Sequence, residues 1–205
     1  DFSIDEATTR AHLRHVADVP GISAITVNAH ASEVHACNPD EQRLVLDLTM
    51  DEIGDELPVI NGIYADGSLE AARLAGMATD GGASCLLVFP PHTIGMREGQ
   101  KRPEMALAHF RTIADATDLP LIVFQYPDGY AYPMDTLLQL FDAVPQIRAV
   151  QDWNYGPIPA RPVRTLHTLP RPIHALSPHR TFRRSPRTPR PTAPPLSPVR
   201  PISPL

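Results

Sequence analysis

Two short stretches of the sequence contain residue types whose spacing could support chemistry. In "HASEVH", His30, Glu33 and His35 place two imidazoles and a carboxylate within one segment, a set that suits several divalent metal ions. The same residues also fit a pocket histidine with a glutamate that caps or holds the loop. In "QIRAVQDWN", the strand-like residues 147–150 give way at Gln151 to a polar cluster, which is typical of a strand that ends at a site or at the surface.

Lys101 is the only lysine in the chain, and lysine is a common nucleophile for covalent chemistry on carbonyl groups. A nucleophilic lysine needs a pKa that burial or a neighbouring cation has lowered. Lys101 lies instead in "MREGQKRPE", a charged segment between two predicted elements. We therefore interpret Lys101 as a solvated loop residue.

Five short and nearly continuous apolar runs predict the strands that position these residues. Runs of this length, rich in β-branched residues, are typical of strands that are buried on both faces, as in a parallel sheet. The runs cover residues 22–30, 57–65, 83–91, 119–127 and 147–153.

Amphipathic segments between the apolar runs predict helices. The best marked follows Asn38, a plausible N-cap, with proline next and Glu41 three residues after the cap. Ser3 and Glu6 have the same capping-box spacing at the start of a leading helix. The predicted helices cover residues 3–19, 38–53, 68–82, 102–118 and 133–144.

Strands that alternate with helices predict an α/β fold with a parallel sheet. Two architectures fit this order, a doubly wound open sheet and a (β/α) barrel. Both place their sites at the carboxyl ends of the strands. Polar side chains gather at those predicted ends: Asn28, His30, Asn61, Tyr64, His92, Gln125, Tyr126, Gln151 and Asp152.

Charge divides the chain into two parts. All 23 acidic residues lie before residue 153, whereas residues 153–205 contain arginines and no acid. We predict a partial barrel domain over residues 1–179, best defined over 1–155, with "RPIHAL" (171–176) as a further strand. Residues 180–205 are rich in proline and arginine and have almost nothing to bury, so we predict that this tail is disordered.

Composition also narrows the class of protein. The acidic start does not resemble a signal peptide and no apolar run approaches membrane-spanning length, so we expect a cytoplasmic protein without a membrane partner. Cys37 and Cys85 then fit core thiols better than a disulfide. The arginine run near residues 180–190 lacks interleaved aromatic residues, so we expect no nucleic-acid partner.

Four segments, in order, resemble the dihydrodipicolinate synthase / N-acetylneuraminate lyase family. "GISAITVNAHASEVHACNPDEQ" resembles the family's second-strand segment, in which a loop glutamate matches Glu33 and a helix glutamate matches Glu41. Residues 57–91 are similar to the third strand, its helix and the fourth strand. "LPLIVFQYP" resembles the fifth strand and "QIRAVQDW" the sixth. The resemblance covers residues 3–155 and continues weakly to residue 180.

The resemblance implies a (β/α)8 TIM barrel, truncated because its first and last strands have no counterpart in this chain, and class I aldolase or lyase chemistry. In that chemistry a sixth-strand lysine forms a Schiff base with pyruvate or another 2-oxo acid, and the iminium acts as an electron sink. A fifth-strand tyrosine relays protons, and a loop after the second strand holds the substrate carboxylate. No cofactor is implied. Family members are often homotetramers, so we expect a homo-oligomer.

The resemblance also maps the catalytic positions of the family onto this chain. The Schiff-base position falls on Gln151, whose amide is not nucleophilic but is long enough to hydrogen-bond a 2-oxo group. The tyrosine position falls on Phe124, and Tyr126, which is on the same face of an ideal strand, could take its place. The arginine used by dihydrodipicolinate synthase itself falls on Gly129, so we do not expect that activity.

The substrate-binding positions differ from the family pattern as well. The paired threonines of the second-strand loop fall on His30 and Ala31, and the double tyrosine after the fourth strand falls on Pro91 and His92. Together with their neighbours in the loop, the predicted substrate-binding residues are Asn28, His30, Ala31, Ser32, Glu33 and His92.

Three functional hypotheses follow. The first is a lyase or aldolase of this family that acts on a 2-oxo acid, with its activity in doubt because Gln151 replaces the lysine. The second is an inactive, truncated barrel that binds a small oxo acid or nothing. The third is a metal-dependent lyase that uses His30, Glu33 and His35.

Overall fold

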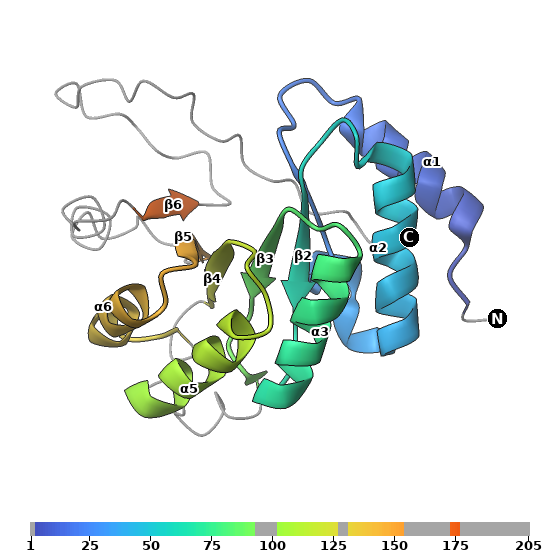
Figure 1. Ribbon diagram of the computed structural model, residues 1–205. Helices are drawn as coiled ribbons and strands as arrows, with labels where there is room; N and C mark the ends of the chain where they lie inside the picture. The colour runs from blue at the N-terminus through green and yellow to red at the C-terminus, as the bar shows by residue number, and fades with distance from the viewer. Residues whose placement is uncertain (1–2, 93–101, 127–130, 154–172, 177–205) are drawn as a thin grey trace, which may run out of the picture.

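The computed structural model describes residues 3–92, 102–126, 131–153 and 173–176, which form one sheet with its helices (Figure 1). The strands are β1 (Ile25–Val27), β2 (Val59–Ile63), β3 (Cys85–Val88), β4 (Leu121–Gln125), β5 (Ile147–Asp152) and β6 (His174–Leu176). The helices are α1 (Glu6–Ala17), α2 (Pro39–Ile53), α3 (Ser68–Asp80), α5 (Pro103–Ala114) and α6 (Met134–Ala143). Two 3-10 turns, His30–Ser32 and Val34–Ala36, lie between β1 and α2.

The described strands are all parallel and pair in chain order from β1 to β6. A doubly wound sheet reverses its strand order partway, whereas a barrel continues in one direction. The order therefore confirms the barrel architecture and excludes the doubly wound alternative. Strand β6 confirms the strand predicted in "RPIHAL". Within the described residues β1 and β6 are not paired with each other, so these strands form an incomplete barrel.

The two faces of the sheet carry separate apolar clusters. The outer face packs against the helices in a large cluster that includes Leu46, Leu86, Phe110 and Leu140. Burial on both faces explains the continuous apolar runs of β2 and β4, in which every residue is buried. The inner cluster comes from the strands and the residues that follow them: Ala29, Ile60, Leu87, Phe89, Ile122, Phe124, Tyr126 and Ala149.

Strand β1 ends in a close approach to β2. Asn28 has a left-handed backbone (φ 51°). Its amide nitrogen donates to the backbone oxygen of Gln42 and to Oδ1 of Asn61, each at 2.8 Å. A Cβ at Gly62 would lie 1.9 Å from the backbone oxygen of Asn28. Only glycine fits at this position, and the contact fixes where the chain leaves β1 and enters the loop at residue 30.

Helix α2 begins as the sequence predicts, whereas α1 does not. Asn38 Oδ1 accepts from two backbone N–H groups of the first turn, and the Glu41 carboxylate accepts from the Asn38 N–H at 2.8 Å. The predicted cap of α1 at Ser3 is wrong. Asp5 is the N-cap, and its carboxylate accepts from both the backbone N–H and the hydroxyl of Thr8. A carboxylate at this end is favoured by the helix dipole as well as by its hydrogen bonds.

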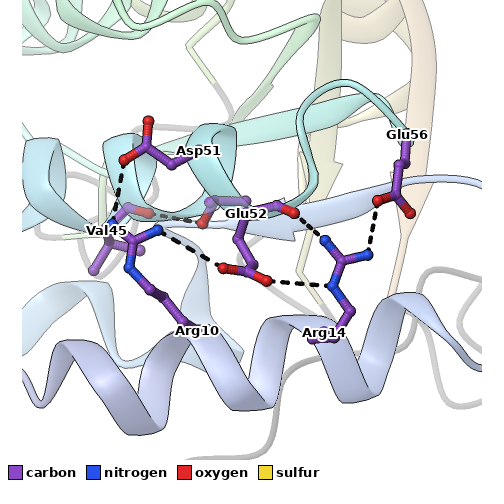
Figure 2. Close-up of polar contacts among 7 residues, drawn as sticks. Arg10, Arg14, Val45, Asp51, Glu52 and Glu56 are labelled. Atoms are coloured by element: carbon purple, nitrogen blue, oxygen red, sulfur yellow. Dashed lines mark hydrogen bonds and ion pairs between the residues drawn. The ribbon is translucent and has the colours of Figure 1, made fainter.

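Helix α1 lies beside α2 and is joined to it by two arginines (Figures 1 and 2). Arg10 pairs with Asp51 at 3.2 Å and with Glu52 at 3.8 Å. Arg14 pairs with Glu52 at 3.3 Å and with Glu56 at 2.8 Å, and it also donates to the backbone carbonyl of Glu52. The acidic end of α2 thus holds the basic side of α1.

Several predictions fall on residues outside the described part of the chain: Lys101, Gly129 and the tail 180–205. Cys37 and Cys85 are described, and both are free and half-buried, so neither is a fully buried core thiol. Across the described residues, no helix combines the length and the apolar character that a membrane span needs.

Candidate functional site

Gln151 lies on the inner face of the sheet, near the end of β5. It pairs in register with Phe124 of β4 on one side and with Leu176 of β6 on the other, and both neighbours contribute to the inner cluster. The Gln151 side chain is half-buried. The residue at the predicted Schiff-base position therefore faces the interior of the incomplete barrel, with an amide where the resemblance implies a nucleophile.

A bulge in β5 directs Gln151 to this face. Leu121 pairs with Ile147, but the next residue of β4 pairs with Ala149, so Arg148 is an extra residue. Ile147 packs in the outer cluster. With regular alternation Gln151, four residues later, would face outward as well. The bulge reverses its direction.

Aromatic side chains gather at the carboxyl ends of β3, β4 and β5, on the inner face of the sheet. The ring centroid of Phe124 lies 4.6 Å from Phe89, 4.9 Å from Tyr126 and 5.9 Å from Trp153. Phe124 and Tyr126 thus share a face, as their spacing predicts. Tyr64 extends the group, with its centroid 6.0 Å from that of Phe89. Hydrogen bonds made among these rings meet little competition from water.

The turn after β1 places the imidazole of His30 among these rings. The His30 ring stacks on Phe89, with centroids 4.7 Å apart and planes at 27°, and meets Tyr64 edge-on at 5.1 Å. Burial is the main cause that lowers the pKa of His30 to about 4, with smaller contributions from the nearby His35 and His92. The imidazole is therefore neutral at pH 7.

Tyr126 forms the shortest polar contact of this group. Its hydroxyl oxygen lies 2.6 Å from Nε2 of His30. Tyr126 is 8% exposed, and burial raises the pKa of its phenol, with smaller contributions from Tyr64 and Asp66. The sequence analysis named Tyr126 and His30 as separate site residues, and the structure joins them as a hydrogen-bonded pair between neutral groups.

The other predicted residues of the loop have different surroundings. Asn28 is 2% exposed and its amide holds the loop against its neighbours, as described above. The hydroxyl of Ser32 accepts from the N–H of Ala29 and donates to its carbonyl, both at 3.0 Å. Asn28 and Ser32 therefore shape the loop. Ala31 is half-buried beside His30, and Glu33 is exposed with a left-handed backbone (φ 53°).

His92 lies at the edge of the aromatic group. It is exposed, and its ring centroid is 6.5 Å from that of Tyr126. The structure thus brings together Gln151, Phe124, Tyr126 and His30, with His92 at their margin.

The pattern of His30, Glu33 and His35 does not form a metal site. Among the described residues, no three histidine, cysteine, aspartate or glutamate side chains come together to hold a metal ion. Nε2 of His30 is bonded to Tyr126, and both Glu33 and His35 are exposed. The left-handed residue at position 33 separates two short turns, so the spacing is not that of one regular element. Within the described part of the chain, the structure therefore provides no three-ligand cluster at His30, Glu33 and His35 for the metal-dependent hypothesis.

Phe89 is the site residue that the sequence analysis missed. It contacts His30, Phe124 and Tyr126 through its ring. A signal was present, because alternate residues of a strand share a face and Cys85, Leu87 and Phe89 all lie at the inner cluster. The continuous apolar run hid this alternation.

Comparison with known sequences gives matches over most of the described chain. Residues 2–154 match the Dihydrodipicolinate synthetase family. The 4-hydroxy-tetrahydrodipicolinate synthase of Methanothermobacter thermautotrophicus is 27% identical over 142 residues, which cover 68% of this chain and 48% of the relative. The probable 5-dehydro-4-deoxyglucarate dehydratase of Streptomyces griseus is 31% identical over 140 residues, which cover 68% of this chain and 41% of the relative. The chain thus spans about half the length of these relatives.

Comparison with solved structures supports the barrel architecture. The dihydrodipicolinate synthase from Acinetobacter baumannii, solved in complex with pyruvate, superposes with a TM-score of 0.73 at 21% sequence identity. The superposition covers 85% of this chain and 58% of that chain. At this identity the likeness shows the fold alone.

Proposed function

The chain belongs to the dihydrodipicolinate synthetase family, and we propose that it binds a small 2-oxo acid, such as pyruvate, beside Gln151 without forming a Schiff base. The observation that carries this proposal is the half-buried amide on the inner face, in register with Phe124. The pyruvate bound to the structural relative from Acinetobacter baumannii supports the class of ligand.

Gln151 can hydrogen-bond a 2-oxo acid, but it cannot form a covalent imine with it. The amide N–H₂ can donate to the 2-oxo oxygen of the ligand, but its delocalised lone pair does not attack the carbonyl carbon. Without an imine there is no electron sink next to C2, so a bond to the neighbouring carbon is not activated. The lyase chemistry of the family is therefore expected to be absent from this chain.

The groups around Gln151 suit the two ends of such a ligand. We place the ligand against the apolar rings of Phe89, Phe124 and Tyr126. These rings lower the local dielectric, and a hydrogen bond to a charged ligand is stronger in such surroundings. We place the carboxylate by the turn at His30 and Ala31, the positions matched to the threonine pair of the family. His92 stands at the exposed margin.

A binding measurement with a matched control tests this function. Calorimetry with pyruvate should detect binding to the wild-type chain. Gln151→Leu, which keeps much of the side-chain volume and removes the amide, should weaken binding by about 5- to 10-fold because one hydrogen bond to a charged ligand is lost. Gln139→Leu, the same change at an exposed position on α6, should leave the affinity unchanged.

Two results would contradict the proposal. Failure of the folded wild-type chain to bind pyruvate would exclude this ligand. Equal affinity in Gln151→Leu and in Gln139→Leu would show that the ligand binds elsewhere.

A further inference from the structure

The pair formed by Tyr126 and His30 has one feature that distance alone does not specify, which is the direction of its hydrogen bond. The phenol carries one proton, and a neutral imidazole carries one proton on either Nδ1 or Nε2. If Nε2 carries it, His30 donates to Tyr126. If Nδ1 carries it, Tyr126 donates to Nε2. The two arrangements present different groups to the pocket.

Charge states restrict the pair to these two neutral forms. Burial lowers the pKa of His30 to about 4 and raises the pKa of Tyr126, so a phenolate–imidazolium pair is disfavoured from both sides. The titratable groups that act on the pair are His35 and His92, which disfavour the imidazolium, and Tyr64 and Asp66, which disfavour the phenolate. All four influences favour the neutral pair.

The surroundings of the phenol decide the direction. Tyr126 is 8% exposed, and beyond His30 its described ring neighbours are Phe89, Phe124 and, at 6.5 Å between centroids, His92. If Tyr126 accepted from Nε2–H, its own proton would need a second acceptor, and among the described residues its hydroxyl is hydrogen-bonded to His30 alone. If Tyr126 donates to Nε2, its one proton is bonded and the phenol has no unpaired donor. The second arrangement costs less free energy.

The consequence lies at the other ring nitrogen. With Nε2 accepting, Nδ1 of His30 carries the proton. Within the described part of the chain, His30 forms its side-chain hydrogen bond through Nε2, and its ring is only half-buried. The Nδ1–H group is thus free to donate to a ligand. The stack on Phe89 and the hydrogen bond to Tyr126 fix the orientation of the His30 imidazole.

We propose that His30, held as the Nδ1–H tautomer by Tyr126, is a neutral hydrogen-bond donor to an oxygen of the bound 2-oxo acid. Tyr126 is then a positioning residue, which acts through His30. This inference rests on the proposed function for the identity of the ligand. It differs from a tyrosine that relays protons, because the Tyr126 proton stays on the bond to Nε2.

Nitrogen-15 spectra of the full chain, labelled at histidine, test the tautomer without any ligand. The His30 signals, assigned by their loss in His30→Phe, should show a protonated Nδ1 and an unprotonated Nε2 at pH 7. In Tyr126→Phe the Nε2 nitrogen loses its donor, and the signals should move towards the tautomer mixture of a free imidazole. Tyr132→Phe removes a phenol hydroxyl in the outer cluster, where the described ring contact of Tyr132 is to Phe110, so it should leave the His30 signals in place.

Pyruvate titration tests the role of the donor. His30→Phe keeps an aromatic ring and removes both nitrogens, and it should weaken pyruvate binding by about tenfold. Tyr126→Phe should weaken binding by a smaller factor, because the donor remains but is no longer fixed. Tyr132→Phe, in the outer cluster, should bind like wild type.

The outcomes separate this inference from the proposed function. A wild-type spectrum in which His30 carries its proton on Nε2 would overturn the inference even if pyruvate binds. Wild-type affinity in a folded His30→Phe variant would overturn the donor role. The predicted tautomer without any pyruvate binding would overturn the proposed function and leave the tautomer established.

Discussion

At the scale of single residues, the site is defined by groups that are polar but uncharged. Gln151 has an uncharged amide at the position where the family resemblance implies a lysine amine. Burial keeps both His30 and Tyr126 neutral. Neutral donors and acceptors can orient a 2-oxo acid, but they supply neither a nucleophile nor a strong base. The residue chemistry therefore favours binding over covalent catalysis.

His109 gives a prediction about stability against pH. It is 3% exposed, its Nδ1 lies 3.1 Å from the hydroxyl of Ser68, and burial lowers its pKa to about 4, against a smaller opposing effect of Asp66. Between pH 6.5 and pH 4 the unfolded chain binds a proton on His109 and the folded chain does not. The stabilisation is thus complete above pH 6.5 and is lost as the pH falls towards 4.

Urea unfolding at pH 7 and pH 4.5 measures this loss. The wild-type free energy of unfolding should fall between the two values, and His109→Gln should reduce that fall by about 2 to 3 kcal/mol, since one pKa unit corresponds to about 1.4 kcal/mol. His15→Gln, at an exposed site on α1, is the control and should reproduce the wild-type fall. The same pH dependence in His109→Gln as in wild type would contradict the assignment.

At the scale of elements, the position of the site depends on local breaks in regular structure. The bulge at Arg148 turns Gln151 inward, and the left-handed Asn28 ends β1 so that the loop crosses β2 at Gly62. Regular strands in the same places would direct different side chains to the pocket.

Gly62 provides a test of this close approach. Gly62→Ala would place a Cβ 1.9 Å from the backbone oxygen of Asn28, so β1 and β2 must move apart. We expect a loss of about 1 to 3 kcal/mol in the free energy of unfolding. The control is Gly76→Ala on α3, where a Cβ has nothing within 4 Å and should be neutral or stabilise the helix by up to about 1 kcal/mol. Equal effects of the two changes in thermal or urea unfolding would contradict the packing described.

Much of the element pattern could be predicted from the sequence, because it depends on local features. Strand runs, helix periodicity and the Asn38–Glu41 capping box are all local. The direction of Gln151 could not be predicted, because a bulge is set by pairing with β4 and strict alternation from Ile147 gives the opposite face. The partnership of His30 with Tyr126 joins residues 96 positions apart, and no spacing rule connects them.

At the scale of the whole molecule, the described strands form an incomplete barrel with α1 attached to the outside of α2 (Figure 1). The attachment uses exposed and half-exposed charges, as Figure 2 shows for Arg10 and Arg14. Such contacts weaken as salt screens them. Periodicity is the same in the two candidate strand orders and does not distinguish them. The family resemblance predicts the barrel order, and the structure confirms it.

Hydrogen exchange of α1 tests how this helix is held. Arg14→Met should speed amide exchange in α1, because it removes the bonds to Glu52 and Glu56, and the difference from wild type should shrink in 1 M salt. Arg43→Met removes a pair within α2, to Asp47, and should leave exchange in α1 unchanged. Faster exchange in both variants would show that the effect is not specific to the α1–α2 contact.

If Gln151 occupies the place of the nucleophile, borohydride trapping with pyruvate followed by mass spectrometry will distinguish the wild-type chain from a lysine variant at this position. The wild-type chain should keep its mass, Gln151→Lys should gain one reduced pyruvate adduct, and the exposed control Gln139→Lys should gain none. An adduct on the wild-type chain, whose only lysine is Lys101, would contradict the account, as would a folded Gln151→Lys variant that traps nothing.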